Sequence, residues 1–456
     1  MDRTTRWQVG FALVMLLCAL VFGAVAAFAF LFQNVADVLP FRQWRPMHVS
    51  AALFWIITGA TAGVMHYKEE VFPARTPSVL RALYLILWIT TILGVFLFYA
   101  FQRFGGREYW EFPPFLCAPL LVAWLLLMAD YFRAWLGRAP DPPLYVWMWT
   151  TGIVFFLITF LEQNLWQVPW FRDHYLREVS VQWKSNGAMV GAWNQMIYGT
   201  ALYLMTVISG DEGIARGRTA FLFWLLGLSN LMFNWGHHIY NVPTAGWIRH
   251  VAYGISMTEW IFFIQIVRSF RAKLEEHRRH KHLLTYRFLI AAEGWVFLNL
   301  FLALFMSVPA INRYTHGTHI TVAHAMGATI GINTMILLGS LGYMLRMDEA
   351  SDRVKRAIAR GRTIALVSLL VFWLALIIAG MLKGYRTTAL GMDDFQRMME
   401  PVMRVLHVFA FAGLGLLAGL GLIAWRYLGL LRTSDRSRVQ MEPDADRTSP
   451  VPHTLP

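Results

Sequence analysis

The sequence has few charged residues for its length. Asp, Glu, Lys and Arg make up 15% of its 456 residues, whereas hydrophobic residues make up 57%, and the mean hydropathy is +0.47. About a quarter of the residues are charged in an ordinary soluble domain, so a fully water-exposed surface is excluded. The composition predicts an all-α integral membrane protein.

The chain also has almost no cysteine. Its two cysteines, Cys18 and Cys117, both lie within apolar stretches. This excludes a disulfide framework, a CxxC redox motif, a CxxCH haem attachment and a thiolate metal cluster, so any metal must use other ligands. No Walker loop or dinucleotide fingerprint is present. The net charge of +13 falls in the polar loops, where it reflects membrane topology, and no nucleic-acid partner is expected.

Twelve apolar stretches approach the length that crosses a bilayer, which is about 20 residues. The first is too long for the apolar part of a cleaved signal peptide and counts as a helix. We predict one twelve-helix transmembrane bundle over residues 1–432 and a disordered polar tail over 433–456. The predicted helices begin near Trp7, Pro46, Leu80, Phe115, Leu144, Gln182, Thr219, Gly246, Leu283, Thr318, Thr363 and Val402.

Lys and Arg are distributed unevenly over the predicted loops. Most of the 40 lie in the N-terminus, the tail and alternate loops, above all in segments 268–287 and 346–362. The positive-inside rule therefore places both termini in the cytoplasm. We expect a multi-pass protein of the cell's inner membrane, surrounded by lipid.

Five polar side chains of the predicted helices fall at one depth. His48 lies near the start of the second helix, Asn186 near the start of the sixth, His237 and His238 at the end of the seventh, and His324 in the first turns of the tenth. In this topology even helices begin outside and odd helices end outside, so all five converge in the outer, periplasmic third of the membrane. Ionisable groups at such depth are costly and usually functional.

The adjacent histidines His237 and His238 point about 100° apart on a helix. Both can reach one metal if the helix ends there, and the following segment 241–243, Asn-Val-Pro, provides such an end. Imidazole nitrogen then favours a first-row transition metal. Two interfacial histidines facing water remain the alternative, as ordinary core histidines do for His48 and His324 taken singly.

Haem fits histidines isolated on separate helices of an aromatic-rich bundle, because an axial imidazole holds its iron. His324 and Met326 are two residues apart, so they point to opposite sides of one helix and could serve different haems. Met raises the potential of a haem that it ligates. Ordinary packing remains open for Met326, which is one of 22 methionines.

At these residues the sequence resembles the catalytic subunit of the haem-copper oxidase superfamily and, within it, the nitric oxide reductases. The likeness spans all twelve predicted helices, and no single motif carries it. Its segments are RPMHVSAALFW (45–55), GREYWE (106–111), GAWNQMIYG (191–199), WGHHIYNVP (235–243), SMTEW (256–260) and RYTHGTHITVAHAMG (313–327).

The resemblance implies roles for individual residues. His324 would be the proximal ligand of a high-spin catalytic haem, His48 a ligand of a low-spin haem, and His237 with His238 ligands of a neighbouring non-haem metal. Glu259 matches a glutamate beside the iron pair of nitric oxide reductases that oxygen reductases lack, and a carboxylate suits iron better than copper. The implied cofactors are two haems, of b type, and non-haem iron or copper.

The resemblance also implies partners. Arg107 and Glu108 match a segment near the haem propionates, where the family can hold a calcium ion that bridges to its cytochrome c subunit. Since the chain has no haem-attachment motif, a membrane-anchored cytochrome c subunit or quinol would donate electrons. His316 and His319 would serve propionates or face solvent.

Four positions depart from the family pattern. Asn186 stands where the family has a third histidine on the non-haem metal, and an amide oxygen is a weaker ligand. Val190 and Asn194 replace two glutamates, which removes carboxylates suited to proton delivery. Met326 replaces the second histidine of the low-spin haem, which would raise its potential.

The expected activity is reduction of nitric oxide at a haem iron and a non-haem metal. Two nitric oxide molecules, two electrons and two protons would give nitrous oxide and water, with Glu259 and Asn186 at the catalytic metal. Dismutation of nitric oxide to dinitrogen and dioxygen is the alternative that suits the missing carboxylates, and a non-catalytic haem-binding paralogue is another. Val190 disfavours an oxygen reductase, because the usual type has a redox tyrosine at that position.

Overall fold

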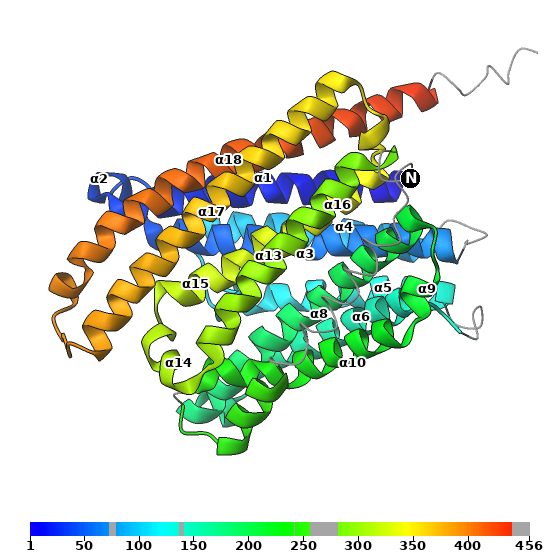
Figure 1. The fold of residues 1–456 in the computed structure, drawn as a ribbon. Helices are drawn as coiled ribbons and strands as arrows, with labels where there is room; N and C mark the ends of the chain where they lie inside the picture. Colours follow the sequence, from blue (N-terminus) through cyan, green and yellow to red (C-terminus); the bar gives the residue numbers. More distant parts are fainter. Residues whose placement is uncertain (73–78, 136–140, 241, 256–280, 440–456) are drawn as a thin grey trace, which may run out of the picture.

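The structure is a computed structural model that describes residues 1–72, 79–135, 141–240, 242–255 and 281–439 (Figure 1). The regular secondary structure of these residues is helical, and their one β-bridge, between Arg107 and Trp110, forms no sheet. The long helices run roughly along one direction, and the N-terminus and the last turns of the final helix lie at the same end of the bundle. The prediction that this end is cytoplasmic remains a prediction.

Among the described residues, nine helical segments are long and apolar enough to cross a membrane. Three of these segments combine consecutive helices, and a fourth is only the apolar part of a longer helix. The bounds given below are those of each apolar segment. The segments are α1 (Arg3–Leu31), α3 (Phe41–Val71), α4 (Val79–Ala100), η1 with α5 (Pro114–Trp135), α6 with η2 (Leu144–Gln167), α13 (Leu283–Ser307), α15 to α16 (His319–Met344), α17 (Asp352–Thr388) and the apolar part of α18 (Phe395–Arg432).

The other three predicted spans are not among these nine segments. The sixth corresponds to α8 (Tyr175–Ser209), a long helix with many polar residues, and the seventh to α10 (Arg218–Phe233), which is shorter than a full span. The eighth, from Gly246, falls largely outside the described residues. The predicted total of twelve is therefore neither confirmed nor contradicted, and α18 continues to Val439, beyond the predicted boundary at residue 432.

Short helices connect these elements, and local chemistry sets several of the boundaries. Asp2 caps α1 by accepting from the backbone of Thr5, and Thr318 caps α15 by accepting from Ile320. Gly210 ends α8 at φ 68°, a left-handed conformation that favours glycine. The connecting elements are α2 (Gln33–Ala36), α7 (Pro169–Arg172), α9 (Gly213–Arg216), η3 (Asn234–Ile239), α14 (Pro309–Thr315) and η5 (Met347–Glu349).

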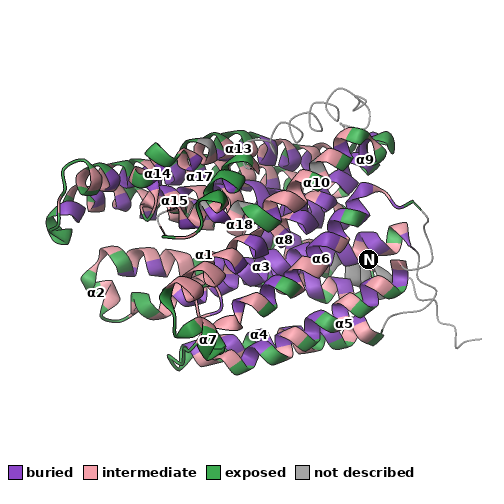
Figure 2. Ribbon diagram, turned by 90° about the horizontal axis from the view of Figure 1, so that it is seen from below, coloured by how far each residue is buried: buried purple, intermediate pink, exposed green. Residues whose placement is uncertain are grey.

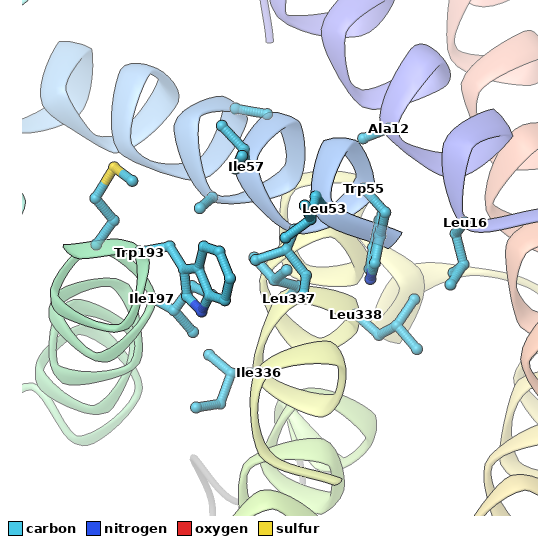
Figure 3. Packing of buried hydrophobic residues seen from close by; sticks show 14 of the residues in the cluster. Ala12, Leu16, Leu53, Trp55, Ile57, Trp193, Ile197, Ile336, Leu337 and Leu338 are labelled. Atoms are coloured by element: carbon cyan, nitrogen blue, oxygen red, sulfur yellow. The ribbon is translucent and has the colours of Figure 1, made fainter. Parts of the chain in front are cut away.

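Helix α3 lies at the centre of the bundle and is the most enclosed of the spanning helices, whereas α1 and α18 expose much of their surface (Figure 2). Large side chains fill the space between α3, α8 (residues 175–209) and α16 (Met335–Met344). Trp193 and Ile197 of α8 face Ile336 of α16, and Leu337 of α16 lies towards α3, near Leu53 (Figure 3). The site described below is therefore built on well-packed helices.

The tenth predicted helix is not a uniform α-helix. An α-helical start, α15 (His319–Met326), passes into a π-helical segment, η4 (Gly327–Thr334), and then into α16. The indole of Trp55 in α3 donates to the Thr334 hydroxyl at 3.0 Å and ties this segment to the bundle centre. Such π segments occur frequently at functional sites.

Candidate haem and metal site

His48 has one ring nitrogen fixed and the other available. Its Nδ1 lies 2.8 Å from the Ala19 carbonyl oxygen of α1, and a carbonyl only accepts, so Nδ1 carries the proton. Its Nε2 is then an acceptor, which is the arrangement of a metal-binding imidazole. A Cβ at Gly23 of α1 would lie 2.6 Å from Nδ1, so the lack of a side chain there lets α1 approach the ring. His48 fits an axial haem ligand.

His324 is in the last turn of α15, directly before the π segment. Its Nδ1 is buried and has no hydrogen-bond partner among the described residues. The backbone of Asn299 in α13 lies close to the ring. An imidazole with a buried nitrogen that the protein leaves unbonded fits an iron ligand. Met326 is half-buried and packs against the core, so both of its predicted readings stay open.

The ring of His238, in η3, lies flat against Trp183 of α8, with ring centroids 5.3 Å apart and planes 10° apart. A Cβ at Gly187 would lie 2.8 Å from Trp235 Cβ and 3.8 Å from His238 Cδ2, so the helix and η3 are in close contact. The imidazoles of His324 and His316 lie near enough for their charges to act on His238. The structure therefore brings His238 and His324 into one region, as the shared depth predicts.

Other predicted members of the site lie outside the described parts of the structure. The whole of Glu259 and the side chain of His237 are among them, so their predicted roles stay predictions. Among the described residues, no group of three or more His, Cys, Asp or Glu side chains could hold a metal ion.

Asn186 is held by two glutamines. Its side chain is 2% exposed, and its Oδ1 accepts hydrogen bonds from Gln163 Nε2 of α6 and, at 3.3 Å, from Gln182 Nε2 one turn earlier in α8. Gln182 Nε2 also donates to Gln163 Oε1 at 2.8 Å and lies 3.4 Å from the Glu108 backbone oxygen. We call Gln163, Gln182 and Asn186 the amide cluster.

Val190 and Asn194, which replace the two glutamates of the family, both have uncharged surroundings among the contacts that the structure describes. Asn194 Oδ1 accepts from Asn333 Nδ2 of η4 at 2.9 Å, and Val190 packs against the hydrophobic core. Asn194 also lines a cavity of about 20 Å³ with Gln195 and Asn230, which has room for one water. This wall offers hydrogen bonds but no carboxylate.

Arg107 and Glu108 take part in ion pairs on the 106–111 segment. Arg107 contacts the Glu178 carboxylate at 2.7 Å, and its guanidinium lies 4.2 Å from the Trp166 ring centroid. Arg45 contacts Glu108 at 3.2 Å and Glu111 at 2.6 Å. Burial raises the pKa of Glu111 above its ordinary value, while Arg45 opposes the shift. Because Arg45 already pairs with both carboxylates, the predicted calcium would have to compete with it.

Sequence reasoning missed the amide cluster and two ion pairs between helices. Of the amide cluster only Asn186 was expected; the i, i+4 spacing of Gln182 and Asn186 is the signal that could have indicated it. One ion pair is buried and joins Lys68 of α3 to Asp130 of α5, 2.7 Å apart with both side chains at most 3% exposed. The other joins Glu162 of α6 to Lys184 of α8.

The described part of the chain is thus a bundle of long apolar helices with imidazoles held between them, which defines a membrane-embedded class of protein. The family model for cytochrome c and quinol oxidase polypeptide I matches residues 3–415. The chain therefore belongs to the haem-copper oxidase subunit I family, whose members are membrane-embedded respiratory oxidoreductases that bind haems and a further metal.

Individual relatives are distant. A nitric oxide reductase subunit of Stutzerimonas stutzeri is 21% identical over 404 residues, which cover 82% of each chain. A cytochrome c oxidase subunit 1 homolog of Agrobacterium tumefaciens and cytochrome c oxidase subunit 1 of Rhodobacter capsulatus are each 22% identical, and the matches cover 64% and 60% of those proteins. A haem-copper terminal oxidase dimer has the same fold, with a TM-score of 0.75 at 13% identity over 94% of this chain and 84% of that one.

Within this family, the described residues fit the two kinds of cofactor unequally. His48 and His324 fit haem iron, because each is a half-buried imidazole with a nitrogen left for a ligand bond. Asn186 does not fit the non-haem metal, because its oxygen already accepts two hydrogen bonds.

Proposed function

We propose that this chain is the catalytic subunit of a membrane-bound oxidoreductase that converts two nitric oxide molecules, two electrons and two protons into nitrous oxide and water. The observation that supports it most is the pair of ligand-ready histidines, His48 and His324, in a chain similar over 82% of its length to part of a nitric oxide reductase. The motif with Glu259 adds support from the sequence.

In this proposal each residue of the site has a separate role in holding a cofactor or positioning a ligand. His48 and His324 hold two haems, whose iron supplies electron transfer and substrate binding. His237, His238 and Glu259 would hold the non-haem iron, which would supply a second site for binding and polarising nitric oxide. Trp183 keeps the His238 ring in one orientation through the flat contact between them. Electrons would come from a membrane-anchored cytochrome c or from quinol, and the polar 106–111 segment, with Arg107 and Glu108, would lie towards that donor.

A second activity is favoured by the neutral wall at Asn186, Val190 and Asn194. Dismutation of two nitric oxide molecules to dinitrogen and dioxygen needs no net electrons or protons, so it requires no carboxylate for proton delivery. At the Asn194 position, where the family has a glutamate, the side chain is a neutral amide that accepts a hydrogen bond from Asn333.

Gas analysis of the purified, haem-loaded protein tests these proposals. Nitric oxide is added without oxygen, with and without a reduced artificial donor. Nitrous oxide that depends on the donor supports reduction, whereas dinitrogen and dioxygen formed without a donor support dismutation. If neither gas mixture forms in a preparation with full haem content, both proposals are wrong and the chain is a non-catalytic haem-binding member of the family.

A further inference from the structure

The amide cluster has a definite direction of hydrogen bonding. A carboxamide oxygen has two lone pairs, whereas a carboxamide nitrogen has only N–H donors. Gln163 and Gln182 each donate to Asn186 Oδ1, so both lone pairs are in use. What Asn186 offers to any further group is therefore its Nδ2, which donates and cannot bind a cation.

The cluster is buried and cross-linked, which fixes this direction. Gln163 and Asn186 are each 2% exposed, and the bond from Gln182 Nε2 to Gln163 Oε1 closes the ring of three amides. If the Asn186 amide were turned over, its N–H groups would face the N–H donors of both glutamines. Its oxygen would then be buried without either hydrogen bond, and each unsatisfied group costs about 1–3 kcal/mol. The α6 and α8 helices are also in direct contact further along, where a Cβ at Gly152 would lie 2.6 Å from the Ala192 carbonyl oxygen.

Asn186 lies in the stretch of α8 whose neighbouring residues contact the site. Trp183, three residues earlier, stacks on His238, and Gly187, the next residue, lies against Trp235 and His238. Residues three apart on a helix share a face, so Asn186 and Trp183 lie on the same side of α8. The imidazole of His324 is close enough to act on His238, which places the iron that His324 would hold in the same region.

We propose that Asn186 is a hydrogen-bond donor to the small molecule bound at the haem of His324, and not a ligand of the non-haem metal. Gln163 and Gln182 are positioning residues that keep its Nδ2 turned away from them. This inference rests on the proposed haem at His324 but does not require the chain to turn over nitric oxide. A donor beside the haem-bound ligand is one of the features by which a distal pocket controls what happens to that ligand.

The test uses carbon monoxide on the reduced haem of the full chain, because a donor that bonds to its oxygen lowers the C–O stretching frequency. Asn186→Asp keeps an oxygen for both glutamines but replaces the N–H groups with an acceptor. We expect the C–O stretch to rise in Asn186→Asp and in Asn186→Leu. The content of non-haem metal per chain in Asn186→Leu should equal that of the wild type.

Two results would overturn the proposal. One is a C–O stretch that is the same in the wild type and both variants, and the other is a loss of non-haem metal in Asn186→Leu, which would make Asn186 a ligand. The matched control is Gln8→Leu, which removes a fully buried amide of α1 that donates to the Thr61 hydroxyl at 2.9 Å, outside the site, and should leave the stretch unchanged. Wild-type protein that binds haem but produces no gas would contradict the proposed activity and leave this test intact.

Discussion

His48 and Asn186 illustrate opposite ways to hold a polar side chain inside a membrane bundle. A backbone carbonyl takes the only proton of the His48 ring and leaves a lone pair available. Two glutamines take both oxygen lone pairs of Asn186 and leave only N–H groups. The neighbours of His48 leave its Nε2 able to bind a metal, whereas the neighbours of Asn186 leave no oxygen lone pair for one. The difference lies in the neighbours, so the identity of the polar residue alone does not determine its role.

The largest expected effect is on the His48 side of this comparison. His48→Ala removes the imidazole that would ligate the low-spin haem, so its low-spin absorption spectrum should be lost while the high-spin haem at His324 remains. Visible spectra of the reduced variant, compared with His324→Ala, measure this. Retention of both spectra in His48→Ala would show that another residue holds that haem.

The ion pair of Lys68 and Asp130 extends the comparison to charged groups. Asp130→Leu leaves the Lys68 ammonium buried without its partner, which costs about 3–5 kcal/mol. We expect a large fall in the melting temperature of the detergent-solubilised protein. The double variant Lys68→Met with Asp130→Leu should recover most of the loss. An equally unstable double variant would mean that packing, not charge, is responsible.

The contact of α6 with α8 can be broken without touching an amide. Gly152→Ala puts a methyl group 2.6 Å from the Ala192 carbonyl oxygen, so the helices must separate at a cost of about 1–3 kcal/mol. Gly294→Ala in α13 is the control, because no atom lies within 4 Å of a Cβ there. Thermal unfolding should show a loss for the first variant and none for the second, and equal behaviour would argue against close α6–α8 packing.

The two glutamines of the amide cluster should not contribute equally. Gln182→Leu removes a 3.3 Å bond to Asn186 and a 2.8 Å bond to Gln163 from a half-buried residue, and each bond is worth about 1 kcal/mol. Gln163→Leu removes the fully buried donor and should lower the melting temperature more. The reverse order would place the main support of Asn186 within α8 rather than across the α6–α8 contact.

The smallest effect concerns pH. Burial lowers the pKa of His316, in the segment between α14 and α15, below its ordinary value of 6.5. The unfolded chain then binds a proton more readily than the folded one, so this residue reduces stability as the pH falls below about 6.5. Between pH 7.5 and 5.5 the melting temperature of His316→Gln should fall slightly less than that of the wild type. An identical fall would show that His316 titrates normally.

The sequence predicts most of the spanning helices because hydropathy reports burial in lipid directly. It places their starts less well: α17 begins at Asp352 although the apolar stretch begins at Thr363, since the polar residues between them continue the helix outside the apolar region. The candidate site was likewise predicted only in part. The depth expected for His48 and His324 comes from the predicted topology, whereas the partners of Asn186 depend on how α6 packs on α8, which no local pattern contains.

The haem content of the purified full-length protein tests the central claim most directly. If His48 and His324 are the ligand-ready imidazoles of a respiratory haem enzyme, the pyridine haemochrome assay should give two haems per chain. A wild-type protein that is folded in detergent and carries no haem would contradict the account, because neither histidine would then serve the role that its surroundings prepare.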